Sequence, residues 1–351
     1  MEAAEAPLAR PPEAPAAATP APPRGARHGW IAPVVVLIAV ATVPAWAGEY
    51  VQDLVTRIVV LSVFALSLEL LVGTTGLVSL GHAAFFGIGA YVAVLAAPSS
   101  GAGFLPAVLL LSMACAAAYA LFVGALSLRT RGVYFIMVTL AFAQMAYFVF
   151  HDTKVGGGSD GIYLNVKPTI PGLIDLQGRV PFFAFALVAL ALVYAFLAAL
   201  RRSRFGHALA GIRVNEQRMR AVGFRTYGYK LAAFVIAGAL AGLAGFLIAV
   251  RDGYVNPEML AWQESGTVLL MLILGGLGHL RGAVVGAAAF TLLKELYSSE
   301  ALVGRTVSDH WQLALGLTII ACVAAMPRGL AGLAWPRRRR PRVTVVVDDD
   351  A

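Results

Sequence analysis

Long apolar runs recur along this chain and constrain its fold more than any other feature. The run at residues 182–200, for example, contains no charged residue and is apolar on every face of a helix. An α-helix rises about 1.5 Å per residue, so roughly 20 apolar residues cross the ~30 Å hydrocarbon core of a bilayer. A transmembrane β-barrel would instead show ~10-residue segments of alternating polarity. The runs therefore predict transmembrane α-helices.

The overall composition agrees with this prediction. Hydrophobic residues make up 59% of the 351 residues and charged residues only 13%, which is too little polar material to cover a water-soluble globule. The net charge of +8 does not indicate nucleic-acid binding. The basic residues lie between and after the apolar runs, where membrane topology alone would place them.

The runs predict an all-α, polytopic membrane protein with about ten transmembrane helices. The expected spans are residues 31–47, 54–72, 77–97, 104–127, 132–150, 181–200, 231–250, 267–278, 283–293 and 311–326. The first run follows basic residues and ends in small ones, as a signal peptide does, but its length favours a retained helix.

The expected spans 267–278 and 283–293 are too short to cross a bilayer alone, and a glycine-rich turn joins them. They form either a broken or re-entrant pair or a simple tight turn between two tilted helices. Irregular backbone at membrane depth needs protein or water to satisfy its amides, so a broken pair would line a pathway.

The distribution of basic residues predicts the orientation. Segment 201–230 contains eight Lys or Arg residues against one acid, Glu216, and the turns 129–131 and 279–282 and the tail 337–340 are also basic. If the N-terminal tail is inside, all of these segments face the same side. By the positive-inside rule, that side is the cytoplasm of an inner or plasma membrane, and both termini lie there.

The chain divides into a membrane domain and two tails. Residues 1–30 are rich in Pro and Ala without apolar periodicity, and we expect a disordered cytoplasmic tail. Residues 31–327 form the transmembrane domain, which includes the cytoplasmic loop 201–230. Residues 328–351 form a basic and then acidic cytoplasmic tail.

The sequence lacks the motifs of an enzyme. It contains no GxxxxGK[ST] phosphate loop, HExxH, GxSxG or CxxC, so we expect no catalytic, cofactor or metal site on this chain. Cys115 and Cys322 lie in apolar runs and are interpreted as packing residues. Ionisable groups are rare in the spans, which counts against an ion-coupled secondary transporter. Glu69 is an exception, and either a functional or a structural role is open to it.

Three segments together match a known family. The first is GLVSLGHAAFFGIGAY at residues 76–91, and the second combines TLAFA at 139–143 with GGSDG at 157–161. The third runs from SRFG at the start of 203–234 to LGGLG at 274–278. In order and spacing the chain resembles the branched-chain amino-acid ABC permeases of the LivM/LivH type, and the second match resembles the LivM branch.

The resemblance, which covers roughly residues 54–330, implies the translocation subunit of an importer. Its partners would be a second, LivH-like permease subunit, two ATPase subunits that bind the ATP, a periplasmic or lipid-anchored substrate-binding protein and membrane lipid. It implies branched-chain or other hydrophobic amino acids as substrates. Urea, amides or aromatic acids, which close relatives carry, are the alternative within the family, and an ion-coupled secondary transporter is the alternative outside it.

Segment 201–230 shows helical periodicity. Apolar residues recur at three- and four-residue steps from Phe205 to Val222, which predicts an amphipathic helix that ends at Gly223. Glu216 would pair with Arg213 and Arg220 on this helix.

The resemblance implies that this loop docks on the ATPase. The expected coupling residues are Arg213, Asn215, Glu216, Arg220 and Gly223. After the Asn-Glu pair, family members usually have alanines where this chain has Gln217–Arg220, which predicts a more basic docking surface.

The glycine-rich segment 156–161 lies on the outer side. It either receives the binding protein or borders the pore entrance, or it is a loop turn in which Asp160 bonds its own backbone. The candidate translocation and entrance residues are Ser79, His82, Gln144, Ser159 and Asp160.

Overall fold

The computed structural model describes residues 37, 39–97, 104–170, 174–300, 304–326 and 329–333, and almost all of these form helices. The long apolar helices are α3 (Glu49–Glu69), α5 (Leu105–Ser127), α6 (Val133–Asp152), α7 (Arg179–Arg202), α10 (Thr226–Asp252) and α15 (Trp311–Ala325). The shorter membrane elements are α4 (His82–Leu95), α11 (Trp262–Gly275) and α12 (Leu280–Ser298). Short terminal and connecting helices are α2 (Val43–Trp46), α14 (Arg305–Ser308) and α16 (Gly329–Leu333).

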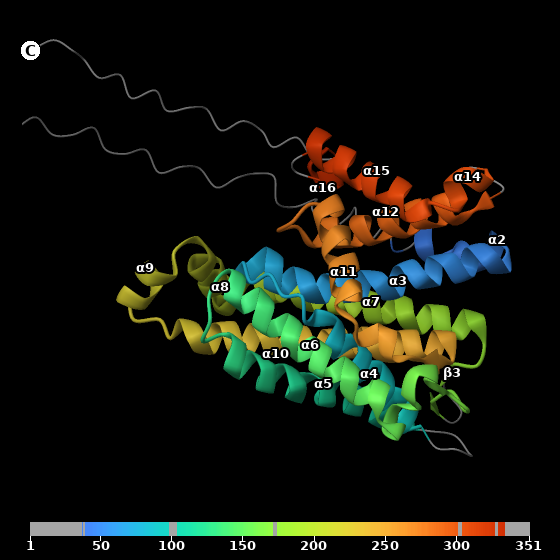
Figure 1. The fold of residues 1–351 in the computed structure, drawn as a ribbon, viewed down its shortest axis with the longest axis horizontal. Coiled ribbons are helices and arrows are strands. Elements are labelled where there is room, and N and C mark those ends of the chain that lie inside the picture. The colour runs from blue at the N-terminus through green and yellow to red at the C-terminus, as the bar shows by residue number, and fades with distance from the viewer. Residues whose placement is uncertain are drawn as a thin grey trace, which may run out of the picture.

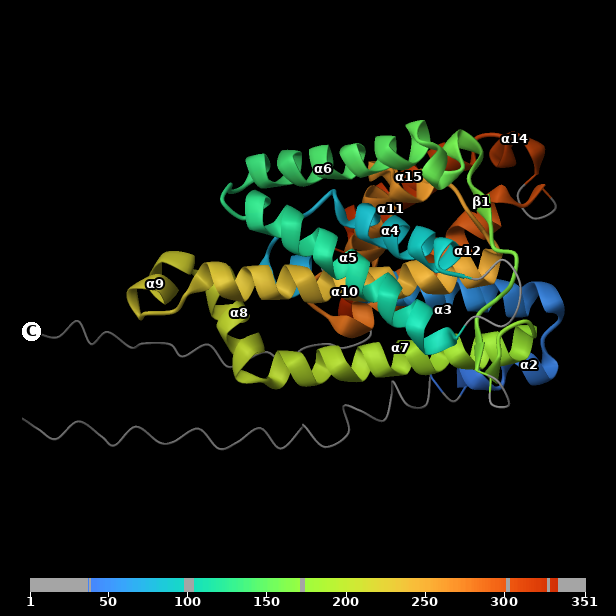
Figure 2. The ribbon, with the colours of Figure 1, turned by 90° about the horizontal axis from the view of Figure 1, so that it is seen from below.

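Two helices, α3 and α10, form the centre of the bundle (Figures 1 and 2). The apolar windows of span Glu49–Thr75, which begins with α3, and of α10 are 78% and 83% buried inside the chain, whereas those of α6 and of span Trp311–Gly332, which begins with α15, are only 22% and 19% buried. Helix α10 packs against α4, α5 and α3, and α3 also contacts α7 and α12. The outer helices therefore leave apolar faces for lipid or for another membrane subunit.

Glycines allow α10 to approach its neighbours closely, as the spacing of Gly238, Gly242 and Gly245 predicts. A Cβ atom at Gly238 would overlap Ala120 of α5, and one at Gly245 would overlap the Phe86 carbonyl oxygen of α4. Such backbone-to-backbone packing replaces hydrophobic burial as the main attraction between helices in a membrane.

The chain breaks its helical path between α3 and α4. Helix α3 continues as a π-helix at Leu70–Thr75, and Gly76 then takes a positive φ of 76°. An irregular segment leads to α4, whose second residue, Ala83, donates its amide to Ser265 Oγ of α11 at 2.8 Å. Both residues are buried. The first amides of a helix lack partners within the helix, and here a hydroxyl from a distant helix accepts the hydrogen bond of one of them inside the protein.

The second break separates α11 from α12, whose axes are bent by 113°. Figure 1 shows α11 crossing the direction of its neighbours steeply, while α12 runs along them. Before α11, a short 3₁₀-helix at Pro257–Leu260 packs against α4, and Leu260 is fully buried. A broken or re-entrant pair therefore describes this region better than two tilted helices joined by a tight turn.

The basic connections gather at one end of the bundle, here called the loop end. Helices α8 (Arg204–Val214) and α9 (Glu216–Ala221) project from it in Figures 1 and 2. Tyr227 donates to the Ala125 carbonyl oxygen of α5 at 2.9 Å, and Arg201 Nη2 donates to the Gly278 carbonyl oxygen at 2.7 Å. The expectation that the basic turns share one side agrees with these contacts. Segment 337–340 lies outside the described residues.

The opposite end is closed by short strands and ion pairs. Strand β1 (Ile162–Tyr163) pairs antiparallel with β4 (Tyr254–Val255), and β2 (Thr169–Ile170) pairs with β3 (Ile174–Asp175). The short 3₁₀-helices Lys154–Gly156 and Gly158–Asp160 precede them.

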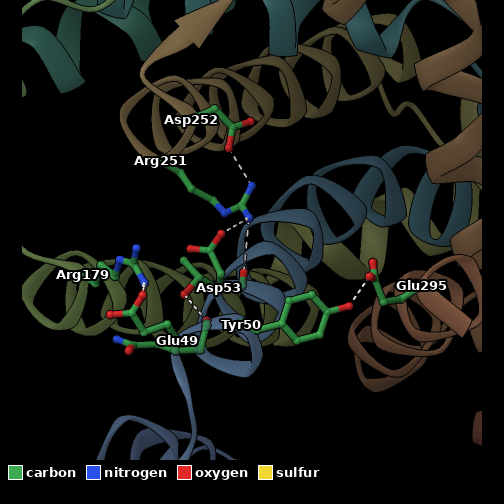
Figure 3. A network of polar contacts seen from close by, with 9 residues as sticks. Glu49, Tyr50, Asp53, Arg179, Arg251, Asp252 and Glu295 are labelled. Carbon is green, nitrogen blue, oxygen red and sulfur yellow. Dashed lines mark hydrogen bonds and ion pairs between the residues drawn. The ribbon is translucent and has the colours of Figure 1, made fainter. Parts of the chain in front are cut away.

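Figure 3 shows the polar network beside these strands. Arg251 bridges Asp53 at 3.2 Å and Asp252 at 2.6 Å, and Arg179 binds Glu49 at 2.6 Å. These pairs join α3, α7 and α10 where their opposite-end turns meet.

The helices match the expected spans from residue 54 onward. By length and hydropathy, six helices among the described residues can each cross a membrane, or seven spans result if the bent α11–α12 pair counts as one. The expected total of about ten also counts α4 and both members of the pair separately. It further includes residues 31–47, of which 31–36 and 38 lie outside the described residues, as do all of tail 1–30 and most of tail 328–351.

Candidate functional site

The loop segment at residues 203–223 folds as two short helices. The Ser203 hydroxyl caps α8 by accepting from the Gly206 amide at 3.3 Å, and the Asn215 side chain caps α9 by accepting from the Arg218 amide at 2.9 Å. The prediction of one continuous amphipathic helix was therefore wrong. Asn215 has an extended backbone and competes with helix hydrogen bonding, so it starts a new helix.

Helix α8 has one buried and one exposed face. Ala208, Leu209 and Ile212 are buried against the bundle, as the periodicity predicts. In contrast, Val214 is 84% exposed and Val222 is 70% exposed. The segment is thus fixed to the membrane helices on one side and presents apolar side chains among basic ones on the other.

Glu216 lies at the centre of a charged cluster. Its Oε1 accepts from Lys230 Nζ at 2.9 Å, from Arg220 Nη2 at 2.5 Å and from the Thr226 hydroxyl at 3.1 Å. Partial burial alone would raise the pKa of Glu216, but the hydrogen bonds from Lys230, Arg220 and Thr226 outweigh it and lower the pKa to about 2. The carboxylate is therefore ionised at neutral pH and holds α9 to the start of α10.

Two other predicted coupling residues lie differently. Gly223 follows α9 with a positive φ of 94°, as a residue that ends a helix does, and nothing lies near the position of a Cβ. Arg213 does not form the expected pair with Glu216. Its Nη1 instead donates to the carbonyl oxygen of Gly73 in the π-helix.

Of the candidate translocation residues, Ser79 and His82 are fully buried beside the α3–α4 break. Ser79 Oγ accepts from the Gly81 amide at 3.2 Å, and His82 Nε2 lies 2.8 Å from Ser67 Oγ. The His82 ring also stacks on Phe64, at 5.6 Å between ring centres. These contacts place both residues in the protein interior rather than at an interface.

The other three candidates are apart from this pair. Gln144 is half-buried on α6, whereas Ser159 and Asp160 are exposed at the opposite end from the loop. Asp160 accepts from the Ser159 hydroxyl at 3.1 Å, and its carbonyl oxygen accepts from Tyr254 at 2.6 Å. The structure therefore does not gather the five candidates into one site.

The described polar side chains form ion pairs and hydrogen bonds within the protein rather than a metal site. Within the ranges given above, no group of three or more His, Cys, Asp or Glu residues is arranged to hold a metal ion. The two regions rich in specific polar contacts are the Glu216 cluster at the loop end and the ion pairs at the opposite end, joined by broken helices.

The fold thus defines a multi-pass α-helical membrane protein. A model of the family described as the permease component of branched-chain amino acid transport systems matches residues 50–324, so the chain belongs to that family.

Named relatives agree with this assignment. The chain is 30% identical over 327 residues to the high-affinity branched-chain amino acid transport system permease protein LivM of Escherichia coli K12, covering 87% of this chain and 75% of that protein. It is 24% identical over 308 residues to the permease protein BraD of Pseudomonas aeruginosa, covering 81% and 96%. It is 27% identical over 133 residues to LivH of E. coli K12, covering 38% of this chain and 41% of that protein. No solved structure matches.

Sequence reasoning missed several residues of the loop end. Arg201, Thr226 and Lys230 were counted only as part of a basic or hydrophilic segment, yet each donates a specific hydrogen bond. A signal for Lys230 was present, because it is a lone basic residue within the start of a long apolar helix. No local signal identifies Gly278 as the acceptor for Arg201, because the two are 77 residues apart.

Proposed function

We propose that this chain is a permease subunit of an importer for branched-chain and other hydrophobic amino acids, energised by separate ATPase subunits that dock on segment 201–230. Membership of the permease family supports a translocation role. Relatives named LivM and LivH support a transport system with a second permease subunit. Both termini would face the cytoplasm of the inner membrane, on the side of the basic loop.

One observation carries the docking assignment. Helices α8 and α9 project from the loop end, yet α8 buries Leu209 and Ile212 against the bundle and the Glu216–Lys230 pair at 2.9 Å fixes α9 to buried helix α10. A surface that receives force from a partner must be both accessible and rigidly joined to the moving helices. A merely lipid-facing basic loop would need no such attachment to the centre of the bundle.

Cross-linking tests this assignment directly. In a chain without its native cysteines, Val214→Cys places a thiol on the exposed face of α8, and Tyr163→Cys places one at a similarly exposed position at the opposite end. We expect Val214→Cys, and not Tyr163→Cys, to cross-link to the ATPase subunits in membranes. An ATPase that links only elsewhere would contradict docking on this segment.

Transport assays test the energy source and the substrate. The complex with its ATPase, second permease and binding protein, reconstituted in proteoliposomes, should take up leucine, isoleucine or valine only with ATP, and vanadate should stop uptake. Uptake by this chain alone, driven by an ion gradient, would contradict the proposal. Parallel assays with urea, a short amide and an aromatic acid decide the substrate class.

A further inference from the structure

Glu69, at the end of α3, carries a buried carboxyl group, and such a group normally has a hydrogen-bonding or charged partner. Its exposed fraction is 0%, and among the described residues neither carboxyl oxygen makes a hydrogen bond of acceptable geometry. A Cβ atom at Gly73 would overlap this carboxyl, so the glycine leaves the space that the carboxyl occupies. A buried carboxylate without a partner is unfavourable, so this conformation leaves the hydrogen-bonding capacity of Glu69 unused.

Two guanidinium groups lie around this carboxyl but bind neutral carbonyl groups. Arg213 of α8 donates to the Gly73 carbonyl oxygen, and Arg201 at the end of α7 donates to the Gly278 carbonyl oxygen at 2.7 Å. The Glu69 carboxyl packs against Gly73, the same residue whose carbonyl oxygen Arg213 binds. A guanidinium binds a carboxylate about twice as strongly as a neutral acceptor. A better acceptor is therefore close to Arg213 and unused.

The segment that Arg213 contacts has an unusual hydrogen-bonding pattern. Residues 70–75 form a π-helix, a rare hydrogen-bonding pattern that is found mostly as single turns at functional sites. The segment leads through Gly76 and a short irregular stretch to α4, which begins inside the protein. A shift of the π-helix would consequently move the start of α4.

We propose that Glu69 is the second acceptor of a conformational switch, in which Arg213 exchanges the Gly73 carbonyl for the Glu69 carboxylate when α8 moves. The exchange transmits movement of the loop to the π-helix and to α4. Arg201 keeps the α11–α12 turn in place beside it. This role rests on the proposed function, because it requires an ATPase that moves α8. Glu69 and Arg213 are positioning residues and need not touch the substrate.

The test is a double-mutant cycle in the reconstituted complex, with Glu69→Gln, Arg213→Gln and the double variant. Each single variant should still co-purify with the ATPase, while ATP-driven uptake falls at least about tenfold, the effect of losing one charged hydrogen bond. The double variant should be no worse than Arg213→Gln, because both changes remove the same exchange. Glu258→Gln makes the same change at an exposed acid of the opposite end and should transport normally.

Several outcomes would overturn the switch. Wild-type uptake by Glu69→Gln would do so, as would losses that multiply in the double variant, since a purely structural role predicts independent effects. If Glu69→Gln does not accumulate, the cycle is run instead between Glu69→Asp, which keeps the charge, and Glu69→Asn, which removes it. Arg213→Gln must then reduce ATP-driven uptake by a larger factor in the Glu69→Asp background than in the Glu69→Asn background. Failure of the wild-type chain to assemble with an ATPase would instead refute the proposed function.

Discussion

Lys230, near the start of α10, lies with its Nζ 2.9 Å from Glu216 Oε1 at the start of α9. Only 8% of the lysine side chain is exposed, and α10 is the most buried of the membrane-length helices. The pair therefore fastens an exposed loop helix to the centre of the bundle. A force applied to α9 would reach α10 without passing through the rest of the loop.

Replacing the central carboxylate should loosen this loop. In Glu216→Gln the hydrogen bonds from Lys230 and Arg220 lose their ionic character, and the buried ammonium group loses its charge partner. We expect trypsin to cut segment 203–223 several-fold faster than in the wild type, with the membrane helices still folded. Glu258→Gln, which changes an exposed acid at the opposite end, is the control. Equal cleavage rates in the two variants would argue against the Glu216 cluster as the contact that holds the loop to the bundle.

Acid should loosen the same cluster within a defined pH range. The pKa of Glu216 is lowered from 4.5 to about 2, so its stabilising effect is complete above about pH 4.5 and is lost as pH falls towards 2. Hydrogen exchange of α9, corrected for its intrinsic pH dependence, should be constant from pH 7 to about 5 and rise below about 4. In Glu216→Gln this acid-induced change should be absent.

Close packing of α10 on α4 should not tolerate one additional methyl group. Gly245→Ala places a Cβ against the Phe86 carbonyl oxygen, a backbone atom that can move only if α4 moves. Overpacking of this kind costs roughly 1–3 kcal/mol or more. We expect a lower melting temperature in detergent and a lower yield. Gly228→Ala on the same helix has no atom within 4 Å of the new Cβ and should behave as the wild type.

The interior start of α4 should depend on a hydroxyl from α11. Ser265→Ala removes the acceptor, 2.8 Å away, of the Ala83 amide and leaves that amide buried without its partner. The loss of such a hydrogen bond costs about 1–3 kcal/mol. The melting temperature should fall by a few degrees, whereas Ser298→Ala, whose exposed hydroxyl bonds only its own helix, should change it little. An unchanged value for Ser265→Ala would mean that water replaces the hydroxyl.

The sequence alone was sufficient to identify the class of protein and to locate its apolar helices. Hydropathy depends on neighbouring residues in one helix, so the apolar runs located α3 to α7, α10 and α15 without reference to the rest of the chain. Helix-ending signals are also local, which is why the helix end at Gly223 was predicted correctly.

The tertiary structure decided which polar groups meet. Arg213 had an acceptable local partner in Glu216, but it binds Gly73, 140 residues away, because Glu216 is taken by Lys230 and Arg220. The bend of 113° between α11 and α12 likewise depends on what packs around the turn. A hydrogen bond is short and directional, so its partner is chosen by the arrangement of distant segments, whereas insertion of a helix into a bilayer requires only its own composition.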